Sequence, residues 1–313
     1  MLLTVTLNAS VDKAYYINHA PKIGDVNRVK RVINTAGGKG LNATRAIMAC
    51  GGSVLATGFV GGFNGQYFLS LLDADGVSHD FVKTAGETRC CINALDEGSS
   101  TEFLEAGSQI SDEELDKFSN HYKNLLSTKS IDAVIISGSV PTGVPADYYA
   151  TLINTAKQSN VDVFFDSSGD LLKNAIAQKP HFIKPNLQEA NDLTGKIISS
   201  KADAAQAAME LASTGIDIVC ITLGADGAII TDGNQSYCSV VDDPSGNEVV
   251  NTVGCGDTFV GTFALCQTQG KNLKDSFEFA LAASRSNAMS QKTGFCDLNE
   301  VKKYLNYTKT TQI

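Results

Sequence analysis

The sequence predicts an α/β fold in which a mostly parallel, doubly wound sheet carries helices on both faces and a small β-sheet forms a lid. From Val54 onward, short apolar runs with strand character alternate with segments of helical periodicity, which is the pattern of a parallel sheet. Several of these runs are apolar throughout, so both faces of the sheet should be covered. Two pairs of β-rich segments, at about 13–34 and 87–106, interrupt the alternation and predict the lid.

Length and composition limit the classes of protein to consider. The 313 residues are 43% hydrophobic, and we expect them to form a single domain over 1–313. A formal net charge of −9 argues against general affinity for nucleic acid or anionic membranes, so an anionic substrate would need a local cluster of cations. The eight cysteines include no Cys-x-x-Cys pair and the four histidines are scattered, which predicts reduced thiols and no structural zinc. The N-terminus lacks a signal-peptide pattern and no apolar run approaches the ~20 residues of a membrane span, so we expect a cytoplasmic protein.

The first elements are a strand and a hairpin. Leu2–Leu7 is a β-rich run that should bring the polar residues of Asn8–Asp12 to a sheet edge, where Asp12 is either a turn residue or a binding acid. Two further β-type runs, Ala14–Ile17 and Val26–Ile33, flank a turn and predict a hairpin inserted before the first helix.

The rest of the chain supplies the core. Its predicted strands are Val54–Phe59, Ala133–Ile136, Val163–Asp166, Phe182–Lys184, Ile218–Thr222 and Ala228–Thr231. One predicted helix opens with the capping box Ser111–Glu114, and others cover Ala146–Ser159, Leu187–Thr194, Lys201–Ser213 and Asn272–Gln291. The second hairpin pairs Cys90–Leu95 with Ser100–Glu105 through a turn at Asp96–Ser99. Gly61–Gly65 has the wrong glycine spacing for a dinucleotide-binding loop and is predicted to be a strand-to-helix turn.

A glycine-rich segment, Thr35–Asn42, precedes the first helix. Gly37, Gly38 and Gly40 would let backbone donors approach a sugar, Lys39 brings a charge suited to phosphate, and Asn42 offers a donor and an acceptor. The segment lacks the leading glycine and the Ser or Thr of a Walker A loop. The alternative is a flexible turn into a helix.

The segment Asn251–Phe259 is the strongest candidate for chemistry. Gly254, Cys255 and Gly256 lead into Asp257, and helical periodicity follows, so Asp257 should lie at or near a helix N-terminus. The unpaired N–H groups of such a turn suit a phosphate, and a carboxylate beside them could accept the proton of an attacking hydroxyl. The alternative is an acidic helix cap.

Two later strands predict a nucleotide site. Lys184-Pro-Asn186 ends one strand and opens a helix containing Glu189, and Thr222–Gly227 ends another with a glycine-rich turn. Ligands bind at the carboxyl ends of strands in open α/β sheets, where these segments and Gly254–Asp257 would meet. Glu189 is then either a helix acid or a group that holds Mg²⁺ through water.

Three basic residues could form the cation cluster that an acidic protein needs. Arg89 precedes the second lid hairpin, Arg28 lies in the first, and Lys39 follows it. If the three converge, they would bind a phosphate already present on the substrate, with Arg supplying a bidentate grip. The alternative for Arg89 is a solvated strand end.

Taken together, the motifs resemble those of the ribokinase-like carbohydrate kinases of the phosphofructokinase B type over nearly the whole chain. They are Asn8-x-Ser-x-Asp12, Gly37-Gly-Lys-Gly-x-Asn42, Asn186-x-x-Glu189, Thr222-x-Gly224 and Gly254-x-Gly-Asp257. Three segments, Thr35–Asn42, Gly86–Arg89 and Ile136–Pro141, look most like the corresponding segments of tagatose 6-phosphate kinases, with fructose 1-phosphate kinases very close. Two positions depart from the family pattern, Ala9 in place of Pro and Cys255 in place of Ala or Ser, and neither removes a functional group.

The resemblance implies a ribokinase-like fold and a set of roles. Asp257 would be the catalytic base, with Gly254, Cys255 and Gly256 forming the anion hole. The sugar phosphate would be bound by Asp12, Arg28, Gly37, Gly38, Lys39, Asn42, Arg89 and Ser139. ATP would be contacted by Lys184, Asn186, Thr222, Gly224, Gly227 and Asn287, and Glu189 would organise Mg²⁺. The lid would form a homodimer contact.

The expected activity is ATP-dependent phosphorylation of the free hydroxymethyl of a ketohexose monophosphate, tagatose 6-phosphate first and fructose 1-phosphate second. A kinase of an unphosphorylated sugar or nucleoside is the nearest alternative, although it would leave Lys39 and Arg89 unpaired in a cleft. A sugar-phosphate-binding regulator without catalysis is the alternative from another class.

Overall fold

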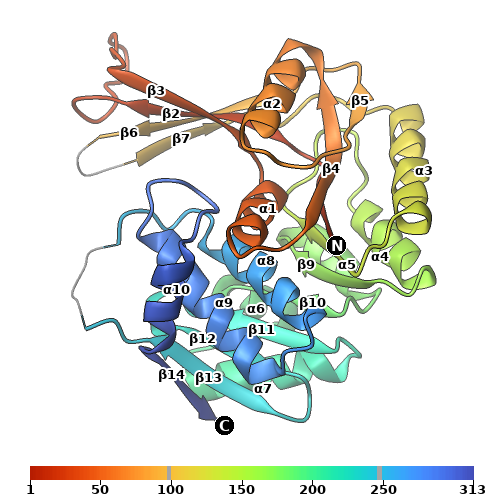
Figure 1. Cartoon of the computed structure of the whole chain (residues 1–313), viewed down its shortest axis with the longest axis vertical. Helices are drawn as coiled ribbons and strands as arrows, with labels where there is room; N and C mark the ends of the chain where they lie inside the picture. The colour runs from red at the N-terminus through yellow and green to blue at the C-terminus, as the bar shows by residue number, and fades with distance from the viewer. Residues whose placement is uncertain (97–99, 245–248) are drawn as a thin grey trace.

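Two sheets organise the chain in a computed structural model that describes residues 1–96, 100–244 and 249–313 (Figure 1). The larger is a ten-stranded sheet in the order β14-β13-β12-β11-β10-β9-β8-β1-β4-β5, and the smaller is a four-stranded sheet in the order β3-β2-β6-β7. The larger sheet contains β1 (Leu2–Thr6), β4 (Val54–Gly61), β5 (Val82–Thr84), β8 (Ala133–Ser137), β9 (Asp162–Asp166), β10 (Phe182–Ile183), β11 (Ile218–Thr222), β12 (Ala228–Thr231), β13 (Ser236–Val241) and β14 (Thr308–Gln312).

The strands from β5 to β11 run parallel, whereas β12, β13 and β14 add antiparallel pairs at one edge. A parallel arrangement requires a crossover between strands, and helices supply most of these crossovers. The helices of the described chain are α1 (Lys39–Ala49), α2 (Gly62–Ala74), α3 (Asp112–Thr128), α4 (Tyr148–Gln158), α5 (Gly169–Ile176), α6 (Leu187–Thr194), α7 (Lys201–Ser213), α8 (Cys255–Thr268), α9 (Leu273–Ala288) and α10 (Leu298–Leu305).

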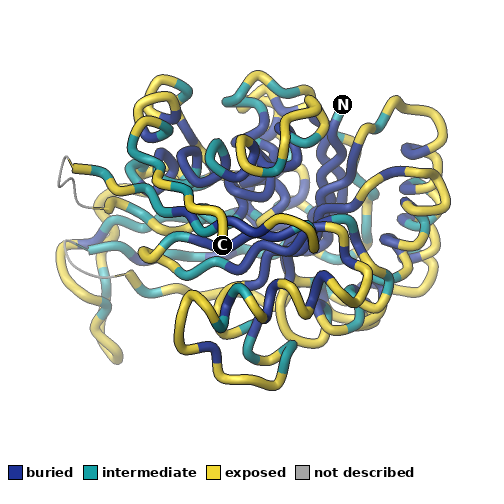
Figure 2. The backbone as a smooth tube through the Cα atoms, turned by 90° about the horizontal axis from the view of Figure 1, so that it is seen from below, coloured by how far each residue is buried: buried dark blue, intermediate teal, exposed yellow. Residues whose placement is uncertain are grey.

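Helices cover both faces of the large sheet, and its strands form the buried middle layer (Figure 2). Alternate residues of β8 show how this works. Ala133 and Ile135 pack in the cluster that includes α1, α8 and α9, while Val134 and Ile136 pack in the cluster that includes α3, α4, α5 and α7. Side chains of successive strand residues point to opposite faces, so a strand buried on both sides is apolar at every position.

The small sheet is the predicted lid, with strands β2 (Ser10–Tyr16), β3 (Arg31–Gly37), β6 (Arg89–Leu95) and β7 (Ser100–Leu104). Each hairpin is antiparallel, and the two join through parallel pairing of β2 with β6, in which Ser10 lies opposite Arg89. One end of the sheet therefore lies over the carboxyl ends of the core strands, and the other projects outward (Figure 1).

The predicted α/β architecture is confirmed, with corrections at particular elements. The first hairpin is shifted, because β2 begins at Ser10 rather than Ala14 and β3 continues to Gly37 in place of a strand over Val26–Lys30. Pairing with β6 explains the earlier start of β2, since it satisfies the backbone of polar residues that look like a turn in the sequence. Strands β5, β13 and β14 and helices α5 and α10 were not predicted. The second hairpin is observed, although most of its predicted turn, residues 97–99, lies outside the described residues.

Local signals located several boundaries correctly. Ser111 and Glu114 form the predicted capping box of α3, and β4 passes directly into α2 at Gly61–Gly62. Among the described helices, none has the length and apolar character needed to cross a membrane.

Candidate active site

Asp257 lies in the first turn of α8, as predicted. Gly254 precedes the helix with a φ of 82°, a left-handed conformation that favours glycine, and a Cβ there would come within 2.8 Å of the Gly294 nitrogen. The Asp257 carboxylate does not cap the helix, because its Oδ2 accepts a 2.8 Å hydrogen bond from Asn42 Nδ2 of α1. In this first turn the Cys255 nitrogen donates to the Thr252 oxygen at 3.3 Å and the Thr258 nitrogen to the Gly254 oxygen at 2.8 Å. The N–H groups of Gly256 and Asp257 have no acceptor among the described residues, so they can bind an anion beside the carboxylate.

The environment of Asp257 raises its pKa from 3.8 to about 6. Burial is the main cause, since the residue is only 5% exposed, and the negative charge of Asp166 adds to it. Lys39, the hydrogen bond from Asn42, and Lys184 act in the opposite direction. A carboxylate with a pKa near 6 is largely ionised at neutral pH and is a stronger proton acceptor than an ordinary aspartate.

Two lysines from different elements share one buried acid. Asp166, the last residue of β9, lies 3.3 Å from Lys184 Nζ and 3.7 Å from Lys39 Nζ. Lys184 also lies against the first turn of α8, since a Cβ on Gly256 would be 3.1 Å from its Nζ. Asp166 raises the pKa of Lys39, followed by smaller effects of Asp257 and Glu189. Lys39 is therefore held in its charged form, and both lysines lie near the anion-binding turn.

The glycine-rich segment is a rigid junction rather than a flexible turn. Gly37 ends β3, Gly38 precedes α1 with a φ of 127°, and Lys39 begins the helix. A Cβ at Gly38 or Gly40 would overlap Thr6 of β1, at 2.4 and 2.3 Å. A Cβ at Gly37 would lie 2.1 Å from the Asp12 carboxyl group. The absence of side chains here lets α1 pack against β1 and leaves room for Asp12.

Asp12 comes from the lid. It lies on β2 between Thr35 of β3 and Cys91 of β6, and its Oδ1 accepts a 2.5 Å hydrogen bond from Ser10 Oγ. Burial raises its pKa, against the lowering effects of Ser10 and the Arg89 charge. A partly buried acid of this kind suits the hydroxyl groups of a sugar.

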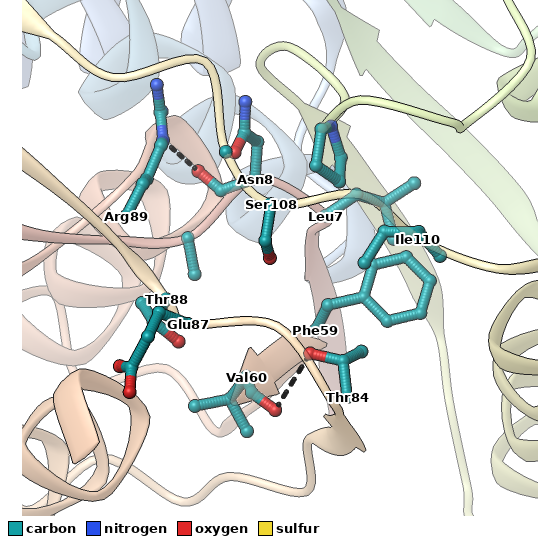
Figure 3. Close-up of a pocket in the computed structure, with 13 residues that line it drawn as sticks. Leu7, Asn8, Phe59, Val60, Thr84, Glu87, Thr88, Arg89, Ser108 and Ile110 are labelled. Carbon is teal, nitrogen blue, oxygen red and sulfur yellow. Dashed lines mark hydrogen bonds between the residues drawn. The ribbon is translucent and has the colours of Figure 1, made fainter. Parts of the chain in front are cut away.

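Arg89 is fixed by two backbone carbonyls. Its Nε donates to the Asn8 oxygen at 3.1 Å (Figure 3). Its Nη1 donates to the Glu105 oxygen at 2.8 Å. The Asn8 side chain donates in turn to Ser139 Oγ at 3.1 Å, and Gly138 lies beside Lys39. Arg89, Ser139 and Lys39 therefore follow one another along the carboxyl edge of the sheet. The small cavity next to Arg89, about 20 Å³, has room for about one water molecule.

Arg28 does not join the other two cations within the chain. It lies in the exposed connection between the outer ends of β2 and β3, whereas Arg89 begins β6 at the core end. The register places Tyr16 opposite Arg31 at the outer end and Ser10 opposite Arg89 at the inner end, and six residues of strand span about 20 Å. The predicted convergence of three cations is therefore wrong for Arg28.

Asn186 and Glu189 form a capping box at the start of α6. Asn186 Oδ1 accepts from the Glu189 nitrogen at 2.9 Å, and Glu189 Oε2 accepts from the Asn186 nitrogen at 2.8 Å. The spacing Asn-x-x-Glu is itself a capping-box pattern, a local role that we did not predict. The other carboxylate oxygen of Glu189, Oε1, has no hydrogen bond within the described ranges, and a hard carboxylate oxygen suits Mg²⁺. The residues fit a magnesium ion held at Glu189 through water, although no cluster of three acidic, His or Cys ligands occurs in the described part of the chain.

The strand β11 brings Thr222 to the same edge, where it forms a bridge with Asn186. Gly224 follows with a φ of 63° and has open space where a Cβ would be, so a ligand could approach its backbone. Gly227 differs, because a Cβ there would lie 2.0 Å from the Ser239 oxygen of β13. Gly227 is thus required for packing of the sheet.

Asn287 is inside the protein, so the predicted contact with adenine is wrong. The residue is 0% exposed. Its Nδ2 donates to the Val253 oxygen at 3.0 Å and to Cys255 Sγ at 3.3 Å, and its Oδ1 accepts from the Phe295 nitrogen at 3.1 Å. Asn287 positions the segments on either side of the α8 N-terminus.

The turn at Gly61–Gly65 is occupied by a protein carboxylate. Glu87 accepts from the nitrogens of Phe63 and Asn64, both at 3.0 Å. The N-terminus of α2 therefore binds an acid of the same chain, which agrees with a structural role for this glycine-rich turn.

Two functional residues were missed from the sequence. Asp166 is the last residue of a predicted strand. An acid that directly follows a buried apolar run lies at the carboxyl edge of the sheet, and this position could have marked Asp166 as a candidate site residue. Asn8 belonged to a recognised motif but received no role, and its contacts with Ala106 and Ser139 appear only in the fold.

Comparison with known proteins agrees with this geometry. Residues 5–300 match the pfkB family carbohydrate kinases. Phosphofructokinase-2 from Escherichia coli is 28% identical with a TM-score of 0.90, and the match covers 98% of each chain. A possible 1-phosphofructokinase from Thermotoga maritima is 25% identical with a TM-score of 0.88, covering 100% of this chain and 99% of that one. Ribokinase from Arabidopsis thaliana, at 23% identity and a TM-score of 0.75 over 98% of each chain, shows that the fold is ribokinase-like. The chain therefore belongs to the pfkB family of carbohydrate kinases and is an ATP-dependent sugar kinase.

Proposed function

We propose that this kinase phosphorylates the free hydroxymethyl group of a ketohexose monophosphate, with tagatose 6-phosphate as the first candidate and fructose 1-phosphate as the second. The observation that carries the proposal is a third cation at the site. Arg89 is held by the Asn8 and Glu105 carbonyls, next to the contact between Asn8 and Ser139, whereas Lys39 and Lys184 share Asp166. Lys39 and Lys184 lie near the transferred phosphoryl group, so Arg89 is the cation left for a phosphate already on the sugar, and a neutral sugar would not need it.

Asp257 acts as the base in this proposal. The substrate oxygen attacks the γ-phosphorus of ATP, the bond from that phosphorus to the ADP oxygen breaks, and the hydroxyl proton passes to the Asp257 carboxylate. Asn42 holds the carboxylate in position through its 2.8 Å hydrogen bond. The first-turn N–H groups of α8, with Lys184, stabilise the negative charge of the transferred phosphoryl group.

Nucleotide binding is assigned to the other end of the site. Lys184, Thr222 and Gly224 lie at the carboxyl ends of β10 and β11 and face the triphosphate. Magnesium, when bound, neutralises phosphate charge, and Glu189 would hold it through water. The capping box with Asn186 fixes the orientation of that carboxylate.

The lid is proposed to bind a second copy of the chain. It exposes apolar side chains on both faces, with Leu104 in the same cross-strand row as Asp12 and with Phe103, 52% exposed, on the opposite face. Small sheets are marginally stable alone, and exposed apolar faces tend to be covered. The related phosphofructokinase-2 has a tetrameric inhibited form, so association occurs in the family.

A substrate panel tests the proposal. ADP release should be measured with tagatose 6-phosphate, fructose 1-phosphate, fructose 6-phosphate and the corresponding free ketohexoses. Fructose 6-phosphate belongs in the panel because a structure of the Escherichia coli relative contains it. We expect the highest kcat/KM with a ketohexose monophosphate. Higher kcat/KM with a free sugar or nucleoside would contradict the proposal, and binding of sugar phosphate without ADP release would favour a regulator.

A further inference from the structure

Two cysteines that are 246 residues apart in sequence face each other at the C-terminal end of α1. Cys50 follows α1 and Cys296 precedes α10, and their Sγ atoms are 3.7 Å apart. Cys296 is 1% exposed and packs with Ala46, Ala282 and other residues of α1, α9 and α10, whereas Cys50 is half-buried. In Figure 1, α9 and α10 lie beside each other below α1.

The contact has the features of an oxidisable pair. The hydrogen bond between the two thiols lowers the pKa of Cys296, and the same interaction together with burial raises the pKa of Cys50. A partly accessible thiol in contact with a second thiol is the arrangement in which a first oxidation can be resolved as a disulfide. The alternative is that both thiols act only as small apolar side chains.

The segment that precedes Cys296 connects this pair to the catalytic residues. Gly294 is wedged between two elements of the site, because a Cβ on it would lie 2.5 Å from Asn42 Cα and a Cβ on Gly254 would lie 2.8 Å from its nitrogen. Asn42 is the hydrogen-bond partner of Asp257. A displacement of Cys296 toward Cys50 therefore acts on tightly packed backbone next to the base.

We propose that Cys50 and Cys296 form a reversible intramolecular disulfide on exposure to a hydroperoxide, and that this disulfide slows phosphoryl transfer. The half-buried Cys50 sulfur, the more accessible of the two, attacks the hydroperoxide as its proton passes to the leaving oxygen, which gives a sulfenic acid and the alcohol. The Cys296 sulfur then attacks the Cys50 sulfur and displaces water. Two thiols and one hydroperoxide give one disulfide, one alcohol and one water, so the thiols are oxidised by two electrons and the O–O bond is reduced. Each oxygen of the broken O–O bond takes up one thiol proton. When the oxidant is hydrogen peroxide, both oxygens become water. The S–S bond of about 2.05 Å requires the sulfurs to approach by roughly 1.7 Å, which pulls the Gly294 turn relative to Asn42.

Disulfide mapping tests the site without reference to the substrate. The full-length protein is treated with hydrogen peroxide, free thiols are alkylated, and peptides are analysed by mass spectrometry before and after dithiothreitol. We expect a peptide pair joined through Cys50 and Cys296 that dithiothreitol separates. Recovery of both cysteines alkylated, or oxidised separately without a link, would overturn the proposal.

Activity measurements test the consequence. The peroxide-treated wild type should lose more than threefold in kcat and regain it with dithiothreitol, while Cys50→Ser and Cys296→Ser should keep their activity through the same treatment. Cys238→Ser is the matched control, since Cys238 is a half-buried cysteine on β13, and it should respond like the wild type. Cys50→Ser alone suffices if the buried Cys296→Ser does not fold. An equal loss in Cys50→Ser would assign the inhibition to another thiol such as Cys255 and overturn the regulatory part.

Discussion

Replacing Asp257 with Asn should abolish most activity and at the same time stabilise the fold. The side chain keeps an oxygen that can accept from Asn42, but it can no longer take the proton of the substrate. Loss of a general base typically costs about 10²–10⁴-fold in kcat. The folded-state pKa of about 6, against 3.8 for an unperturbed aspartate, means that the ionised wild-type side chain is destabilising by ~3 kcal/mol at neutral pH.

The pH dependence separates this cause from a general effect of the substitution. A carboxyl group with a raised folded-state pKa binds its proton more tightly in the folded protein, so the penalty is complete above pH ~6 and disappears as the pH falls toward 3.8. The stability advantage of Asp257→Asn should therefore be ~3 kcal/mol at pH 8 and below ~1 kcal/mol at pH 4.

Urea unfolding at the two pH values measures this difference, and steady-state ADP release measures kcat. Asp116→Asn on the exposed surface of α3 is the control for loss of one negative charge and should change neither quantity appreciably. A variant that is no more stable than the wild type at pH 8 would refute the argument from a desolvated charge. A kcat within threefold of the wild type would refute the assignment of the base.

Three further predictions concern the neighbouring elements. Asp166→Asn should shift the acidic limb of kcat/KM to lower pH, because the Asp166 charge raises the pKa of Asp257, and a shift to higher pH would contradict this. Arg89→Ala should raise the KM for sugar phosphate by about 10- to 150-fold with little change in the KM for ATP, since a charge-assisted contact contributes about 1.5–3 kcal/mol. The surface control Lys83→Ala should leave both constants unchanged, and an equal effect of Arg89→Ala on free sugar would exclude the phosphate contact. Phe103→Asp should convert a dimer to monomers in light scattering, and a wild type that is already monomeric at micromolar concentration would exclude the lid contact.

Local patterns in the sequence were enough to predict the class of fold and the helix N-terminus that carries Asp257. Apolar runs in β8 and β11 have no polar alternation, so only a sheet covered on both faces fits them. The glycines around Cys255 and the following helical periodicity placed Asp257 at a helix N-terminus, since these signals act over a few residues.

Contacts between side chains that are distant in sequence could not be predicted and became visible in the folded chain. Arg28 and Arg89 both belong to the predicted lid segments, but the register of the lid strands places them at opposite ends of the small sheet. Asn287 was predicted to contact ATP, yet it is buried and its amide is hydrogen-bonded to the backbone of Val253 and Phe295. Asp166 gains its role from two lysines on distant segments, and no local pattern encodes such a contact because it depends on how β9, β10 and α1 pack. Short-range preferences fix elements and caps, whereas the pairing of charges and the raised pKa of Asp257 arise from burial and long-range packing.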